Sequence, residues 1–169
     1  MTPRNGGTAP AESMGADPSA MSGLELLRSM IGRPERGPGI ARLLGMDVES
    51  IDEGRVVFAV RTRPDFANPL GTTHGGICAT LLDSVMACAV HTTLGPGVGY
   101  TTLELKVNYV RAVSTDDRRL TATGTVVHSG RTTAIAEGRV VDERDRLVAH
   151  ATTTCIVLTD APSDAPVRH

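Results

Sequence analysis

Aromatic residues are scarce in this chain of 169 residues, which has two Tyr, two Phe and no Trp. The stacking platforms on which single-strand nucleic-acid binders depend are therefore largely missing. A basic surplus is missing too, because 17 Lys and Arg stand against 19 Asp and Glu and give a net charge of −2. Such a chain cannot neutralise many phosphates of a nucleic-acid backbone. We therefore expect no nucleic-acid partner.

Cysteine and long apolar runs are also rare. Cys78, Cys88 and Cys155 are odd in number and lack a Cys-x-x-Cys spacing, which indicates neither a disulfide framework nor a zinc site. No stretch of about 18 apolar residues occurs, and the first residues lack the apolar segment of a secretory signal. These absences predict a soluble, cytoplasmic protein without a membrane partner.

Composition divides the chain into one domain and two tails. Residues 1–20 and 159–169 are rich in small residues and proline, which predicts disordered tails. The segment between them, 21–158, has enough apolar residues for a single core. A short helix is expected over 22–32, with Ser22 as its N-cap.

Most of the domain is predicted to be strand. Six segments are rich in Val, Thr and Ile and are separated by turn residues, and the last four follow one another without a helix. This order favours an antiparallel sheet, with 142–146 as a hairpin turn. The segments are 44–50, 55–62, 101–110, 120–128, 132–141 and 147–158.

One segment, 76–94, is apolar on nearly every face and too long for a strand. We expect a buried central helix. Helix and sheet together predict an α+β domain in which one antiparallel sheet wraps around one long helix.

Asp83 is the only ionisable residue in this helix before His91. Burying an unpaired carboxylate is costly, so its presence needs a reason. One interpretation is a catalytic carboxylate. The other is a structural residue that caps a loop or pairs with an arginine such as Arg55 or Arg111.

The segment before the helix, from Asn68 to Gly76, ends in His74-Gly75-Gly76. Two glycines at a helix start leave backbone N–H groups unobstructed, with the positive end of the helix dipole behind them. That arrangement can polarise a carbonyl, although a plain glycine-rich turn is the alternative. His74, Asp83 and His91 match no common metal-ligand spacing, and we expect neither metal nor cofactor.

These features together resemble a known family. The pattern Asn-x-x-Gly-x-x-His-Gly-Gly, followed by a hydrophobic helix with Asp83, is similar to the hotdog-fold acyl-CoA thioesterases of the PaaI-like and human THEM2-like type. The resemblance continues through 103–111 and the strands as far as residue 158. It implies the hotdog fold, hydrolysis of an acyl-CoA thioester, and assembly as homodimers that often pair into homotetramers.

The resemblance also implies residue roles. Gly75 N–H would polarise the thioester carbonyl, and Asp83 would be the nucleophile or the general base for water. Asn68 and His74 would orient the thioester or the attacking water, with His74 also holding the loop.

Two further positions follow from the resemblance. In some relatives a hydroxyl at the start of the next strand positions water, and counting back from Tyr109 this is Thr102. The alternation of the strand instead puts Thr101 on the face of Leu103, so both threonines stay open. The CoA moiety would meet Arg111 and the turn Ser129, Gly130, Arg131 and Thr132.

The spacing of Gly75 and Asp83 bears on assembly. Eight residues of helix span about 12 Å, so one thioester cannot touch both. A twofold dimer with antiparallel helices would bring Gly75 of one protomer opposite Asp83 of the other. We therefore expect the homodimer to be the minimal active unit.

Other functions remain as alternatives. The first is a non-catalytic acyl-CoA-binding hotdog module, a sensor or regulator, but such members generally lack the acidic residue on the helix. A hotdog hydratase would use a different Asp/His arrangement. A serine hydrolase is disfavoured because the chain has no Gly-x-Ser-x-Gly.

Overall fold

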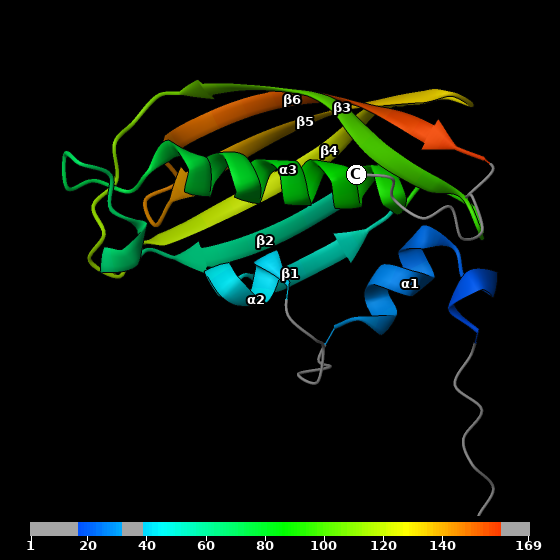
Figure 1. Ribbon diagram of the computed structural model, residues 1–169, viewed down its shortest axis with the longest axis horizontal. Coiled ribbons are helices and arrows are strands. Elements are labelled where there is room, and N and C mark those ends of the chain that lie inside the picture. Colours follow the sequence, from blue (N-terminus) through cyan, green and yellow to red (C-terminus); the bar gives the residue numbers. More distant parts are fainter. Residues whose placement is uncertain (1–16, 32–38, 160–169) are drawn as a thin grey trace, which may run out of the picture.

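The computed structural model describes residues 17–31 and 39–159. Within them one antiparallel sheet of six strands has the spatial order β1-β2-β4-β5-β6-β3. The long helix α3 (Gly75–His91) lies against the sheet, which curls around it (Figure 1). The predicted α+β architecture is confirmed. The strands are β1 (Asp47–Asp52), β2 (Arg55–Arg61), β3 (Gly99–Tyr109), β4 (Arg119–Ser129), β5 (Thr133–Asp142) and β6 (Leu147–Leu158).

The element boundaries follow local signals. Ser22 caps α1 (Gly23–Ser29) as expected, in a capping box with Glu25. The first predicted strand begins too early, because Leu44 is the last residue of α2 (Ile40–Leu44), which ends at Gly45 with φ of 69°. That short helix and its left-handed cap were not predicted.

The predicted tails are only partly within the described residues. Residues 1–16 and 160–169 lie outside them, as does Gly32, the last residue of the range predicted for the first helix. The end of the predicted N-terminal tail forms a short 3₁₀ helix, η1 (Pro18–Ala20). Another such turn, η2 (Pro64–Phe66), follows β2 and leads into the segment before α3.

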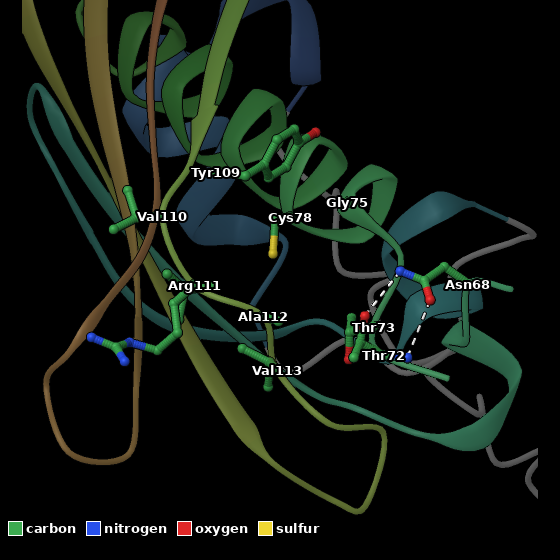
Figure 2. A pocket seen from close by; sticks show the side chains of 11 residues that line it. Asn68, Thr72, Thr73, Gly75, Cys78, Tyr109, Val110, Arg111, Ala112 and Val113 are labelled. Carbon is green, nitrogen blue, oxygen red and sulfur yellow. Dashed lines mark hydrogen bonds between the residues drawn. The ribbon is translucent and has the colours of Figure 1, made fainter. Parts of the chain in front are cut away.

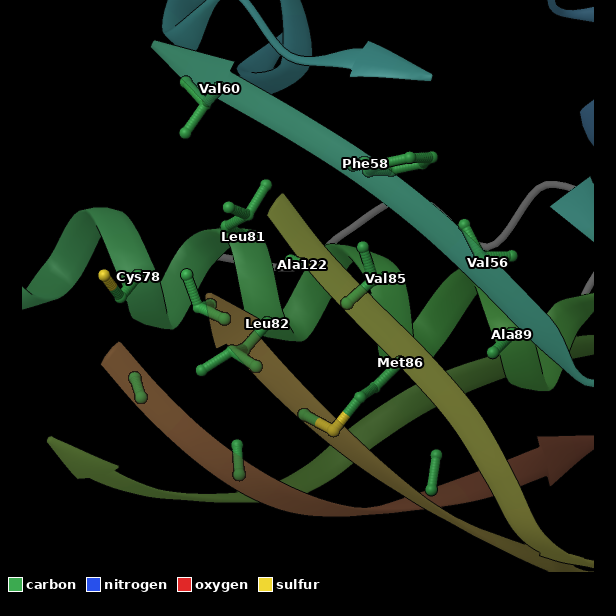
Figure 3. Close-up of a cluster of buried hydrophobic side chains, with 14 of the residues drawn as sticks. Val56, Phe58, Val60, Cys78, Leu81, Leu82, Val85, Met86, Ala89 and Ala122 are labelled. Carbon is green, nitrogen blue, oxygen red and sulfur yellow. The ribbon is translucent and has the colours of Figure 1, made fainter. Parts of the chain in front are cut away.

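The core lies between α3 and the sheet, and both contribute buried apolar side chains to it. Four of the fully buried side chains of α3 face small residues of the sheet (Figure 3). This pairing of large with small residues lets the sheet approach the helix closely. The helix residues are Leu81, Leu82, Val85 and Met86, and the small ones include Ala122, Gly124, Ala136, Gly138 and Ala151.

Strand β3, at one edge of the sheet in the single chain, positions the site. It passes along α3 in the opposite direction. Its last residue, Tyr109, lies against Gly75 at the start of the helix. Near its other end Thr102 contacts Asp83, two turns further along the helix.

Candidate active site

The start of α3 is built by His74. Its imidazole Nδ1 accepts a hydrogen bond from Gly76 N–H at 2.9 Å, and its carbonyl accepts one from Ile77 N–H at 3.0 Å. This capping satisfies two of the amides that a helix start leaves free. Gly75 N–H has no acceptor among the described residues. It is therefore free to donate to a ligand, at the positive end of the helix dipole.

Asn68 closes the loop that precedes the helix. Its Nδ2 donates to Thr72 Oγ1 at 2.9 Å and its Oδ1 accepts from Thr72 N–H at 3.2 Å (Figure 2). The same Oδ1 also accepts from Leu70 N–H at 2.9 Å. Asparagine side chains commonly hold turns in this way. One Nδ2 hydrogen is left over, so Asn68 shapes the loop and can still offer one donor toward Gly75.

Asp83 lies partly buried on α3, and Thr102 Oγ1 donates to its Oδ1 at 3.1 Å. No ion pair involves Asp83 within the described residues. The arginine partners considered from the sequence are wrong, because Arg55 contacts Ser50 and Arg111 is exposed beside a cavity. A carboxylate without a cation, held by one hydroxyl, is suited to act as a base or nucleophile.

The neighbouring thiols are poor nucleophiles. Burial raises the pKa of Cys78 to about 11, and burial together with the charge of Asp83 raises the pKa of Cys88 to about 11. Burial also raises the pKa of Cys155. Since the thiolate is the reactive form, these three cysteines are inert thiols at neutral pH. Asp83 is thus the stronger nucleophile candidate.

A cavity of about 380 Å³ opens beside Gly75. Asn68, Cys78, Tyr109 and Arg111 line it as well (Figure 2). Asp83 and Thr102 are not among its lining residues. Three of the predicted site residues therefore line one cavity in the single chain, namely Asn68, Gly75 and Arg111.

The turn expected to meet CoA lies elsewhere. Ser129, at the end of β4, shares a hydrogen bond of 2.9 Å with Thr93, which follows the C-terminal end of α3. Gly130, Arg131 and Thr132 continue this turn, and Arg131 is exposed. The turn is therefore at the opposite end of the helix from Gly75.

Metal-ligand clusters and membrane-spanning helices are both absent from residues 17–31 and 39–159. No three His, Cys, Asp or Glu side chains gather in these ranges as metal ligands would. No helix in that part of the chain is long and apolar enough to cross a membrane. The cytoplasmic location stays a prediction.

Comparisons with known proteins decide the family. A model of the thioesterase superfamily matches residues 70–149. A mutant form of the phenylacetic acid degradation protein PaaI from Thermus thermophilus is 32% identical and has a TM-score of 0.63, covering 69% of this chain and 96% of that one. The chain belongs to the PaaI-like branch of the thioesterase superfamily.

Two curated relatives of this thioesterase point to the same class of enzyme. The acyl-coenzyme A thioesterase PaaI of Escherichia coli strain K12 is 28% identical over 109 residues, which are 64% of this chain and 75% of that protein. Human acyl-coenzyme A thioesterase 13 is 27% identical over 111 residues, 64% of this chain and 76% of that protein. The predicted hotdog fold and the class of thioester hydrolase are confirmed.

Two residues of the thioesterase cavity, Tyr109 and Cys78, were not predicted as site residues. The alternation of β3 carried a signal for the first, because Tyr109 shares the helix-facing side of the strand with Leu105 and Val107. No sequence pattern marked Cys78. Helix periodicity places it one turn after Gly75, but its position in the cavity wall depends on how the helix packs on the sheet.

Proposed function

We propose that this thioesterase hydrolyses a small aryl- or acyl-CoA thioester to the free acid and CoA, at sites completed by two protomers. Asp83 of one protomer is the nucleophile or the general base for water. Gly75 N–H of the other protomer polarises the thioester carbonyl. The observation that carries the proposal is the placement of a free N–H and a cation-free carboxylate eight residues apart on one helix, about 12 Å along its axis.

The face of α3 that the sheet leaves uncovered supports a dimer. It carries Gly76, Thr80, Asp83 and Ser84, all only partly buried in the single chain. The Thr80 and Ser84 hydroxyls donate to carbonyls one turn earlier, at 2.9 and 2.7 Å, so they require no other partner. Small, satisfied side chains allow close approach of a second α3. An antiparallel approach about a twofold axis then forms two equivalent sites.

Two chemical routes fit Asp83. As a general base, its carboxylate takes a proton from water, the oxygen of that water adds to the carbonyl carbon, and the C–S bond breaks as CoA leaves and takes the proton. As a nucleophile, the carboxylate itself displaces CoA, and water then hydrolyses the acyl-aspartyl anhydride. In both routes Gly75 N–H meets the charge that develops on the carbonyl oxygen. Thr102 holds the carboxylate in one orientation.

The CoA moiety is proposed to meet Arg111 and the turn Ser129–Thr132. Arg111 is exposed at the rim of the cavity beside Gly75, and Arg131 is exposed in the turn. Guanidinium groups suit the phosphates of CoA. Because Arg111 and the turn lie at opposite ends of α3, antiparallel helices bring each arginine toward the other protomer's turn. A homotetramer built from two such dimers stays a prediction from the family.

The central experiment is Asp83→Asn, which keeps the shape of the side chain and removes its basicity. We expect kcat to fall by at least about a hundredfold while the melting temperature is retained. Thiol release is measured on a panel of CoA thioesters from short aliphatic through phenylacetyl to long-chain. Unchanged turnover of the whole panel would end the assignment of Asp83. Binding without turnover by the wild type would instead favour the non-catalytic acyl-CoA module.

The donor role of Gly75 has a matched pair of variants. Gly75→Pro removes the N–H, and proline suits the first helical position because His74 already has an extended ψ of 134°. Gly75→Ala adds a comparable Cβ but keeps the N–H. We expect Gly75→Pro to have a kcat about 10- to 100-fold below that of Gly75→Ala. Equal kcat values would show that the amide does not act on the carbonyl.

A further inference from the structure

The carbonyl-polarising end of α3 has few free donors. Gly76 N–H is bound to His74 Nδ1, and Ile77 N–H is bound to the His74 carbonyl. Of the first three amides of the helix, Gly75 N–H alone has no acceptor among the residues that the structure describes. Sites that stabilise an oxyanion commonly place two donors on it. A second donor here has to come from another element.

Tyr109 brings a phenol to this position. A methyl group built on Gly75 would lie 3.0 Å from Tyr109 Cζ, 3.1 Å from Cε1 and 3.3 Å from Oη. The tip of the ring therefore covers the first residue of α3, as Figure 2 shows from the side of the cavity. Because an amide nitrogen and a Cβ share one Cα, Oη lies within about 6 Å of Gly75 N. A glycine at 75 leaves room for the ring, and a Cβ there would make the ring shift by a few tenths of an ångström.

The Tyr109 hydroxyl is free to serve a ligand. Its side chain makes no hydrogen bond within residues 17–31 and 39–159, and the residue is 57% exposed. It lines the same cavity as Gly75 and Asn68. Asn68 is the competing donor, but its Oδ1 and one Nδ2 hydrogen hold its own loop. The Tyr109 hydroxyl has no such hydrogen bonds to break when it turns toward a substrate.

We propose that the Tyr109 hydroxyl is the second hydrogen-bond donor to the thioester carbonyl oxygen, beside Gly75 N–H. The inference rests on the proposed function. It assigns Tyr109 a catalytic contact with the reacting group, and it gives Gly75 two purposes, which are to present its amide and to make room for the phenol.

The test is Tyr109→Phe, which removes one oxygen atom and keeps the ring. We expect kcat on CoA thioesters to fall about 10- to 100-fold and KM to rise by a smaller factor, because the donor binds the substrate carbonyl but acts most strongly on the transition state. A ketone analogue, in which a methylene replaces the thioester sulfur of acyl-CoA, keeps the carbonyl and cannot be hydrolysed. Its affinity should fall in Tyr109→Phe, whereas the affinity for CoA, which has no carbonyl at this position, should stay the same. The melting temperature of the variant controls for folding.

Several outcomes would overturn the assignment. If Tyr109→Phe kept both the wild-type kcat and the wild-type affinity for the ketone, the hydroxyl would not be a donor. If Tyr109→Phe were fully active and Tyr109→Ala were not, the ring would be a wall of the site and nothing more. In either case, hydrolysis of CoA thioesters by the wild type would still support the proposed function. A wild type that hydrolysed no CoA thioester would instead overturn the proposed function and, with it, the role of Tyr109.

Discussion

At the scale of single residues, a bulge in β3 decides which threonine meets Asp83. The pairing of β3 with β6 is regular on both sides of Leu103, which has no partner of its own and is 60% exposed. The extra residue reverses the alternation. Thr102 therefore shares the helix-facing side with Leu105, and Thr101 is exposed on the other side. Strict alternation, applied to the sequence, could not choose between the two threonines.

This bulge provides a matched test. Thr102→Val keeps the shape and removes the hydroxyl that holds Asp83, so we expect kcat to fall about tenfold, the effect of losing one hydrogen bond to a charged group. Thr101→Val makes the same change on the exposed side and should leave kcat unchanged. Steady-state assays of both variants decide the matter, and equal effects on kcat would contradict the bulged register.

The carboxylate of Asp142 links stability to pH in the β5–β6 hairpin. It is buried, and Arg146 Nε donates to it at 2.8 Å while Arg144 N–H and Arg146 N–H donate at 3.0 Å each. The hydrogen bond from the Arg146 side chain is the main cause that lowers the pKa of Asp142 to about 2, from an ordinary 3.8. Because the pKa is lower in the folded state, this stabilisation is fully present above the ordinary pKa and is lost as the pH falls toward 2.

We therefore expect Asp142→Asn to melt at a lower temperature than the wild type near neutral pH. The gap should narrow as the pH falls from about 4 to about 2, since the wild-type carboxylate becomes protonated there. Thermal unfolding followed by circular dichroism across this range measures it. A gap that did not change with pH would mean that the charge of Asp142 does not matter.

At the scale of elements, two glycines of the sheet show how closely it wraps α3. A Cβ on Gly124 of β4 would lie 2.5 Å from the backbone carbonyl of Val85, so the strand nearly touches the helix backbone. A Cβ on Gly138 of β5 would meet only side chains, at 2.9 Å from Met86 Cγ and 3.0 Å from Leu82 Cδ2. Backbone cannot move aside without shifting the whole helix, whereas methionine adapts readily.

This contrast predicts unequal costs. Gly138→Ala should lower the free energy of unfolding by about 1–3 kcal/mol, the usual penalty of an overpacked core, and Gly124→Ala by more than about 3 kcal/mol. Urea titrations of the two variants give both values. If Gly124→Ala were the milder change, α3 would not rest on β4 as closely as described.

Across the molecule as a whole, the two parts of the proposed site lie apart along α3. The loop of Asn68, the Gly75 amide and Tyr109 gather at the cavity at one end of α3. Asp83 lies about two turns further along the same helix, where Thr102 of β3 donates to its carboxylate. A rigid helix cannot fold back to join them, so the proposed site needs a second copy of the chain.

Mixing two inactive variants tests this proposal. Gly75→Pro and Asp83→Asn each inactivate both sites of their own homodimer, but a heterodimer carries both changes in one site and none in the other. After unfolding and refolding an equimolar mixture together, we expect about a quarter of the wild-type activity, since half of the dimers are heterodimers with one intact site each. Activity no greater than that of the separate variants would show that each chain supplies its own complete site.

The architecture and the candidate residues of this thioesterase could be predicted from the amino-acid sequence. The periodicity of apolar residues distinguishes α3 from the strands because helices and strands bury residues at different spacings. For β6 both predicted ends, 147 and 158, agree with the structure. Asp83 was visible as the one carboxylate in an apolar helix. Gly75 and Gly76 could be recognised because two glycines at the start of a helix leave its backbone N–H groups unobstructed.

Which of these residues contact one another could not be predicted from the sequence and follows from the packing of the fold. The bulge at Leu103, the place of Tyr109 on Gly75 and the absence of an arginine beside Asp83 among the described residues depend on contacts between segments far apart in the chain. Periodicity records which side of an element is buried, but it does not record the register in which two elements pack. One extra residue in a strand changes that register, and the chemistry of the site changes with it.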